Sequence, residues 1–162
     1  MRTVARVFMN RRMLNEQKVR EGLVCVVTGS IKFESGGDAD IIKITDEVEQ
    51  AVRDTGLLDG TVTVFVPGAT GALTTLEFEP GVVHDLRQLL DDIVPPGKHY
   101  AHNDNLGDGN GHSHVRAGLL GPSLTVPFVD GRLTLGRWQN IVFCDFDARP
   151  RSRSLVVQVM GV

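Results

Sequence analysis

Short apolar and β-branched runs separated by turn residues are the dominant pattern of this chain, and they predict strands. The Asp130-Gly131 dipeptide between two of the runs favours a tight hairpin turn. A turn over residues 34–38 likewise predicts that the first two runs pair as a hairpin. The runs are Val26 to Phe33, Ile41 to Ile44, Thr61 to Val66, Thr70 to Glu77, Ser123 to Val129, Arg132 to Gly136, Asn140 to Phe146 and Ser154 to Met160.

Two segments instead carry apolar residues at helical spacing. The first begins at Thr45, a suitable N-cap, and stops at Gly56. The second begins at Pro80, a residue suited to the first helical turn, and continues to Ile93. Runs of strands interrupted by two main helices, without regular strand–helix alternation, predict an α+β fold with mostly antiparallel sheets.

The chain opens with an arginine-rich leader whose pattern is weak. Thr3 to Met9 has the composition of a strand, and Asn15 to Arg20 that of a helical turn. We therefore expect a basic N-terminal extension over residues 1–25, followed by a single domain over residues 26–162.

Composition narrows the class of protein. The chain has 162 residues, of which 41% are hydrophobic and 23% charged, and no apolar run approaches the length of a membrane span. A net charge of -3 argues against general nucleic-acid binding. Cys25 and Cys144 belong to no paired motif and no secretory signal is visible. We expect a soluble cytoplasmic domain with packed thiols, no nucleic-acid partner and no membrane partner.

Four of the five histidines lie within the polar segment from His99 to His114. Its Gly, Asn and Asp residues are poor core material, and a long loop in a compact domain is often functional. Neutral imidazole suits transition metals, whereas magnesium prefers oxygen ligands. The segment therefore predicts a metal site for an ion such as zinc, or a proton-transfer site. The alternative is a solvated crossover whose histidines have no chemical role.

Backbone geometry limits which histidines can act together. Residues two apart diverge on a helix and share a face on a strand. If residues 111–120 form a helix capped by Asn110, only one of His112 and His114 faces the site. We expect His102 and His114 to pair, with His112 as an optional ligand.

Glu77 is the best carboxylate from elsewhere in the chain, because it ends an extended segment where it can face a cleft. A pocket of Glu77, His102 and His114 would suit acid–base or metal-assisted chemistry.

Two other motifs suit anions. Backbone N–H groups around Thr70 and Gly71 could form an anion cradle, or Gly68 could simply permit a tight bend after Pro67. The alternating arginines near the C-terminus would lie on one side of an extended chain, where they could bind phosphate or form a solvated charge stripe. These arginines are Arg149, Arg151 and Arg153.

Five motifs follow one another along the chain: Val64 to Glu77, His102 to His114, Gly121 to Pro127, Gly131 to Ile141 and Arg149 to Arg153. Through them, residues 26–162 resemble the YjbQ family (UPF0047), also called secondary thiamine-phosphate synthase enzymes. The resemblance implies an α+β sandwich that forms a homotrimer, with the histidine segment at a metal- or anion-binding pocket. It also implies a weak activity that joins a pyrimidine pyrophosphate to a thiazole phosphate and releases pyrophosphate.

The resemblance carries family residues onto His102, His114 and Glu77, and a Gly-x-Trp-Gln element onto Gly136, Trp138 and Gln139. Trp138 and Gln139 would line a pocket or a subunit contact. Many family members have a histidine where this chain has Gly68, so a three-histidine site would need His112 as its third arm.

Two functions follow as hypotheses. One is an enzyme that acts on a small phosphorylated compound, with zinc, or with magnesium if the synthase activity holds. The other is a non-catalytic trimer that binds a metal or an anion. The predicted catalytic residues are Glu77, His102 and His114; the predicted anion-binding residues are Thr70, Gly71, Asn110, Gln139 and Arg149; the predicted metal ligands are His102, His114 and His112.

Overall fold

The computed structural model describes residues 19–162, and the elements predicted for the leader before residue 19 lie outside the described residues. The helices are α1 Thr45–Thr55, α2 Pro80–Ile93, α3 Ala101–Leu106 and α4 Gly111–Leu120. The strands are β1 Cys25–Ser35, β2 Asp40–Lys43, β3 Gly60–Phe65, β4 Gly71–Leu76, β5 Ser123–Val129, β6 Arg132–Leu133, β7 Asn140–Asp145 and β8 Arg151–Gly161.

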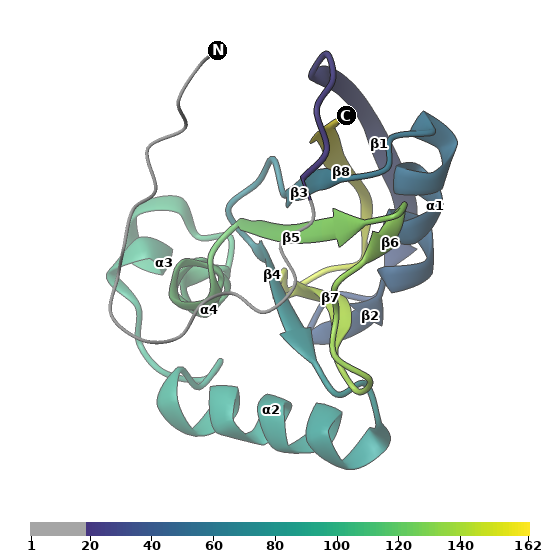
Figure 1. Ribbon diagram of the computed structural model, residues 1–162. Helices are drawn as coiled ribbons and strands as arrows, with labels where there is room; N and C mark the ends of the chain where they lie inside the picture. The colour runs from purple at the N-terminus through teal and green to yellow at the C-terminus, as the bar shows by residue number, and fades with distance from the viewer. Residues whose placement is uncertain (1–18) are drawn as a thin grey trace, which may run out of the picture.

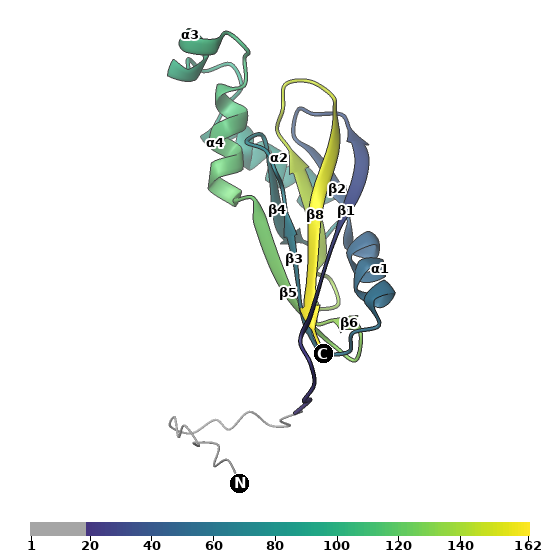
Figure 2. The ribbon, with the colours of Figure 1, turned by 90° about the horizontal axis from the view of Figure 1, so that it is seen from above.

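The strands form two antiparallel sheets that pack as a sandwich (Figure 1). The larger sheet has the order β1-β8-β3-β5-β6, and the smaller has the order β2-β7-β4. Figure 2 shows α1 beside the larger sheet and α4 at the opposite side of the molecule. The prediction of a mostly antiparallel α+β fold is confirmed.

The predicted hairpin of the first two strands is wrong. β1 pairs with β8 along its whole length, and β2 pairs with β7 in the other sheet. Between them Gly37, Asp38 and Ala39 have positive φ angles of 70°, 49° and 59°. This left-handed stretch takes the chain from one sheet to the other, a long-range choice that local turn residues do not reveal.

Two apolar clusters explain the layers. The first fills the space between the sheets and under α1, with Val62, Phe143 and Val157 among its buried members. The second lies on the outer face of the small sheet, where Leu90 of α2 and Ala117 of α4 pack. The burial of α2 and α4 on this face brings the histidine-rich segment between them against the sandwich.

The observed ends of the two main helices agree only in part with those predicted from the sequence. α2 matches its predicted range, and the Glu79 carboxylate accepts hydrogen bonds from the N–H groups of Gly81 and Val82. Thr45 is not the N-cap of α1: it is the first helical residue, and its buried hydroxyl accepts a 2.9 Å bond from the Ile141 N–H. The hydroxyl therefore joins the helix to β7.

The two cysteines differ. Cys144 is buried as expected, and burial raises the pKa of its thiol to about 12. Cys25 is exposed, so the expectation that it packs is wrong. Within residues 19–162, no helix combines the length and apolar content that crossing a membrane requires.

Candidate functional site

The histidine-rich segment is not the open loop expected from its composition. It contains α3 and the start of α4, joined by a tight connection. Gly107 and Gly109 adopt left-handed backbone with φ of 63° and 75°, conformations that favour glycine. They turn the chain so sharply that Asp108, between them, returns toward His102 on α3.

Polar contacts anchor this segment to the end of α2. The buried Arg116 of α4 donates bonds of 3.0 and 2.7 Å to the Val94 carbonyl, and one of 2.7 Å to Asp91. The Tyr100 hydroxyl donates to the Pro95 carbonyl at 2.8 Å. A cation at the C-terminus of α2 also suits the helix dipole. Contacts with the end of α2, rather than contacts among the histidines, thus hold α3 and α4 in position.

His102, Asp108 and His114 form the cluster itself. One ligand atom from each lies within 4.8 Å of the other two. The His102 Nε2 atom is 3.1 Å from Asp108 Oδ1, and the two imidazole rings meet edge to face with centroids 4.4 Å apart. The imidazoles are half-buried and the carboxylate is exposed. The prediction that His102 and His114 lie together therefore agrees with the structure.

Hydrogen bonds define the state of two of these groups. His114 Nδ1 lies 2.9 Å from the Ala69 carbonyl oxygen, which can only accept, so Nδ1 carries the proton and Nε2 keeps its lone pair. The Asn110 N–H donates to Asp108 at 3.0 Å. This bond, together with the charges and hydrogen bond of the two histidines, lowers the pKa of Asp108 despite some desolvation. Asp108 is therefore anionic at neutral pH.

His112 lies apart from the cluster. The sequence predicts that, if a helix begins after Asn110, only one of His112 and His114 faces the site. α4 does begin at Gly111, with Asn110 as its N-cap. His112 is buried beside Tyr100, and its Nδ1 makes no hydrogen bond within the described chain. Burial, followed by the charge of Arg116, lowers its pKa. It is not placed to act as the third metal ligand.

A buried charge network lies directly behind the cluster. Asp145 has none of its surface exposed, and the Arg153 guanidinium binds it through two nitrogens, one at 2.6 Å. The Thr70 hydroxyl donates to Asp147 at 3.1 Å and accepts from Arg153 at 3.1 Å. Burial raises the pKa of Asp147, but hydrogen bonds from Arg151, the Arg149 N–H and Thr70 outweigh it and lower the pKa overall.

This network assigns several predicted anion ligands to structural roles. The Thr70 hydroxyl already has two partners inside the protein. A Cβ on Gly71 would lie 2.7 Å from the buried Phe143 ring, so close packing accounts for this glycine. The Asn110 side chain accepts from Ser113 and from the Ala148 N–H, which fastens the β7–β8 loop to α4. The Thr70 hydroxyl is therefore not free for an anion, and the backbone cradle around Thr70 and Gly71 stays a prediction.

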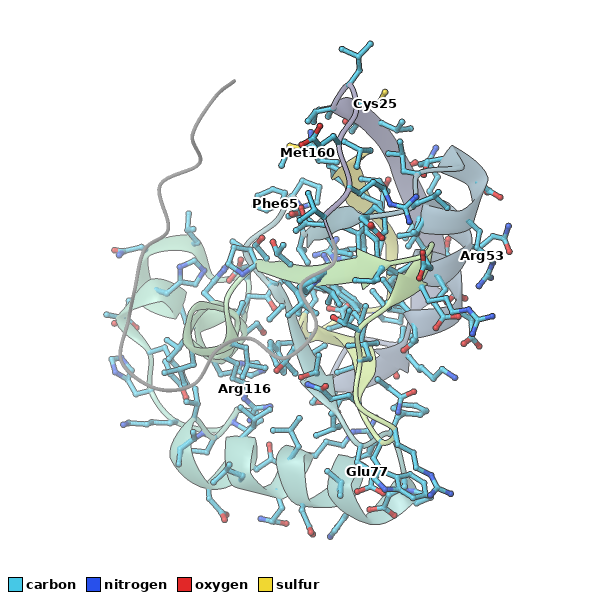
Figure 3. The ribbon with its side chains drawn as sticks, in the orientation of Figure 1. Cys25, Arg53, Phe65, Glu77, Arg116 and Met160 are labelled. Carbon is cyan, nitrogen blue, oxygen red and sulfur yellow. The ribbon has the colours of Figure 1, made fainter. Side chains whose placement is uncertain are left out.

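The other predicted residues lie away from the cluster. Glu77 is exposed at the far end of β4, and Figure 3 shows it near the start of α2, well away from Arg116 on α4. At about 3.3 Å per residue, a strand of this length separates Thr70 from Glu77 by roughly 20 Å. The pocket of Glu77, His102 and His114 is therefore not assembled within one chain.

Gln139 belongs to the same far end, where it accepts from the Gly136 N–H and donates to Thr75. Trp138 beside it is 61% exposed under the Arg137 guanidinium. Arg149, in the β7–β8 loop, is exposed.

Asp108 is the site residue that the sequence analysis missed. It stands six residues after His102 and six before His114, within a Gly-Asp-Gly triplet. That spacing, with glycines on both sides that permit a sharp turn, is the sequence signal that could have identified Asp108. The sequence analysis instead selects Glu77, because that residue ends an extended segment where it can face a cleft.

Comparison with known proteins gives a consistent result. The model of the family described as "UPF0047 protein YjbQ-like" matches residues 29–162. A UPF0047 protein of Archaeoglobus fulgidus is 43% identical over 121 residues, which are 75% of this chain and 91% of that protein. YugU of Bacillus subtilis is 35% identical over 124 residues, 75% and 90% of the two chains.

Solved structures agree with the sequence comparison. A crystal structure of a YbjQ-like protein of unknown function from Sulfolobus solfataricus superposes with a TM-score of 0.81 at 30% identity, covering 86% of this chain and 99% of that one. A hypothetical protein from Aeropyrum pernix has a TM-score of 0.78 at 32% identity, covering 84% and 99%.

Proposed function

The chain belongs to the UPF0047 YjbQ-like family, and from the geometry of its cluster we propose that His102, Asp108 and His114 bind one divalent transition-metal ion and form the centre of a metal-dependent enzyme. The observation that carries this proposal is the convergence of two imidazoles and one carboxylate within 4.8 Å. Three protein ligands with a position left open are typical of catalytic zinc sites, whereas structural sites have four.

The donor set fits such an ion. Two tetrahedral ligands at about 2.1 Å from one zinc ion are roughly 3.4 Å apart, so the three donor atoms need only small side-chain adjustments. The Ala69 carbonyl holds His114 with Nε2 unprotonated, as a ligand requires. Two imidazoles and a single carboxylate favour zinc, iron or a similar metal over magnesium. Of the two cofactors considered, zinc is the one we propose.

The residues of the chain suggest how the site works. A bound ion of this type polarises a substrate oxygen and lowers the pKa of a coordinated water to about 7. Asp108 would contribute a negative charge to the bound ion, and His102 and His114 would each contribute one neutral imidazole nitrogen as a ligand. The buried network behind them holds the backbone of residues 69–70 and 145–148 in place. We propose a small phosphorylated compound as substrate, with thiamine-phosphate synthesis as one candidate reaction.

Metal analysis of the purified full-length protein tests the proposal. We expect about one zinc ion per chain in the wild type, and its loss in His102→Ala, His114→Ala and Asp108→Asn. His99→Ala is the matched control, because this exposed histidine lies in the same segment outside the cluster. Metal-free wild type that remains metal-free after incubation with zinc would refute the proposed centre.

Turnover separates an enzyme from a metal-binding protein without activity. We expect the zinc-loaded protein to convert the two phosphorylated thiamine precursors slowly, and His114→Ala to lose that activity. If the wild type binds zinc but turns over neither these precursors nor other small phosphate esters, the non-catalytic alternative holds. Glu77→Gln is expected to retain the activity of a single-chain site, because Glu77 is outside the cluster.

We also propose a homotrimer, for which the exposed face of the larger sheet provides support. Val26, Phe65 and Met160 are apolar residues on β1, β3 and β8 with 57%, 42% and 47% of their surfaces exposed, and Figure 3 shows Phe65 and Met160 on the same side of the molecule. Exposed apolar patches on a sheet often mark an interface. Light scattering coupled to size-exclusion chromatography measures the mass, and a monomer at micromolar concentration would refute the trimer.

A further inference from the structure

Arg151 at the start of β8 is anchored at one end of its guanidinium and free at the other. Its Nε is 3.0 Å from Asp147 Oδ2, while its side chain is 46% exposed. Its two terminal nitrogens make no hydrogen bond within the described range 19–162, and the only carboxylate paired with the guanidinium there is that of Asp147. A guanidinium held in this way presents a pre-oriented pair of donors to solvent.

Two links place this guanidinium beside the cluster. Asp147 Oδ2 also accepts from the Thr70 hydroxyl at 3.1 Å, and the preceding carbonyl, that of Ala69, is bound by His114. On the other side, the Ala148 N–H donates to Asn110, two residues from Asp108. The Asp108 charge is among those that raise the pKa of Arg151.

The neighbouring arginines differ from Arg151 in this respect. Arg153 is 13% exposed and its guanidinium is occupied by Asp145 and Thr70. Arg149 is exposed, and its side chain has no carboxylate that fixes its direction among residues 19–162. Of the three arginines singled out in the sequence, Arg151 alone combines a fixed orientation with free donors.

We propose that Arg151 binds an oxyanion group of the substrate, a phosphoryl or a carboxylate group, while the reacting part of the same molecule lies at His102, Asp108 and His114. This inference rests on the proposed function, since it assigns the substrate class of that site. The chemistry agrees with it: a divalent ion with the single carboxylate of Asp108 would leave the centre positive, and Arg151, whose charge is paired with Asp147, adds hydrogen-bond donors beside it. Such a site attracts anions.

Calorimetric titration of the full-length protein with inorganic phosphate, and separately with acetate, tests the inference in zinc-loaded and metal-free forms. We expect Arg151→Gln to weaken binding of one of these anions by about 10-fold or more, because it removes charge-assisted bonds. Arg151→Lys should recover only part of the affinity, since an ammonium lacks the paired donors. Arg149→Gln, a change of the same charge in the same loop, should weaken binding by less than about 2-fold. The anion that responds identifies the group.

The outcomes separate this inference from the proposed function. Zinc content and melting temperature measured on the same samples show whether Arg151→Gln leaves the centre and the fold intact. If the protein takes up no zinc, the proposed function fails, and the metal-free titration alone decides the role of Arg151. Equal losses in the Arg151 and Arg149 variants, unchanged binding in Arg151→Gln, or no binding of either anion to the wild type would each overturn the inference.

Discussion

The two ends of β4 make an instructive comparison, because the sequence suggested chemistry at both. At the end that begins with Gly71, the strand is buried, and the residue before it joins Asp147 and Arg153 in a network against α4. At the other end Glu77 is exposed beside a turn. A carboxylate becomes part of a site when the fold brings partners to it, and Glu77 is not part of the group that His102 and His114 form with Asp108.

The buried end of β4 contains two kinds of polar group, which differ in whether their hydrogen-bonding and ligand capacity is already used. The carboxylates of Asp145 and Asp147 are fully used by arginines, hydroxyls and N–H groups. The His102–Asp108–His114 cluster instead offers one possible ligand atom from each residue, all within 4.8 Å of one another. Satisfied buried charges hold a structure in place, whereas groups with unused ligand capacity are available for chemistry.

The largest effect is expected from breaking the buried ion pair. Arg153→Leu leaves Asp145 charged and without compensation, so we expect the free energy of unfolding to fall by about 3–5 kcal/mol in urea titration. Arg137→Leu, near the other end of β4, removes an exposed cation from the Trp138 ring and should cost less than about 1 kcal/mol. Similar losses in both variants would show that the two ends do not differ in this respect.

Zinc should stabilise only the end that carries the cluster. At a free zinc concentration 100 times the dissociation constant, binding to the folded state alone adds about 2.7 kcal/mol to the free energy of unfolding. Thermal melts should show this gain in the wild type and in Glu77→Gln but not in His114→Ala. A gain that survives in His114→Ala would locate the metal elsewhere.

The two ends of β4 should also differ in how tightly their residues are packed, with the tighter packing at the buried end. Gly71→Ala places a methyl group 2.7 Å from the buried Phe143 ring and should cost about 1–3 kcal/mol. Gly136→Ala, in the loop near the far end, meets only the Gln139 side chain at 3.4 Å and should cost less than about 0.5 kcal/mol. Urea titration of both variants measures the difference, and a harmless Gly71→Ala would mean that the core around β4 can shift.

The smallest effect concerns pH. His112 has a pKa lowered from 6.5 because burial and then the Arg116 charge favour the neutral ring. The unfolded chain takes up this proton first, so the stability contributed by neutral His112 is complete above pH 6.5 and declines as the pH falls below that value. Replacing His112 by Gln should flatten this part of the stability–pH curve, whereas His84→Gln on the exposed face of α2 should leave the curve unchanged. Identical curves for His112→Gln and wild type would remove His112 as the source.

Local signals were sufficient for much of the fold. The spacing of apolar residues and the flanking prolines located α2. The predicted strand runs from Thr61 to Val66 and from Asn140 to Phe146 agree with β3 and β7 to within one residue at each end. The stereochemistry of a helix also separated His114 from His112 once α4 was allowed for. These predictions hold because they depend on the backbone within a few residues.

Local signals could not predict which strands pair or which distant side chains come together. Whether β1 pairs with β2 or with β8 depends on which surfaces the whole chain buries, and the turn between β1 and β2 is compatible with either. Asp108 reaches the histidines because two glycines with positive φ reverse the chain and Arg116 fixes α4 against α2. The sequence by itself thus determined which segments form helices or strands and which side chains share a face of each. The tertiary structure alone decided which of the candidate side chains meet, since that depends on contacts between segments far apart in the sequence.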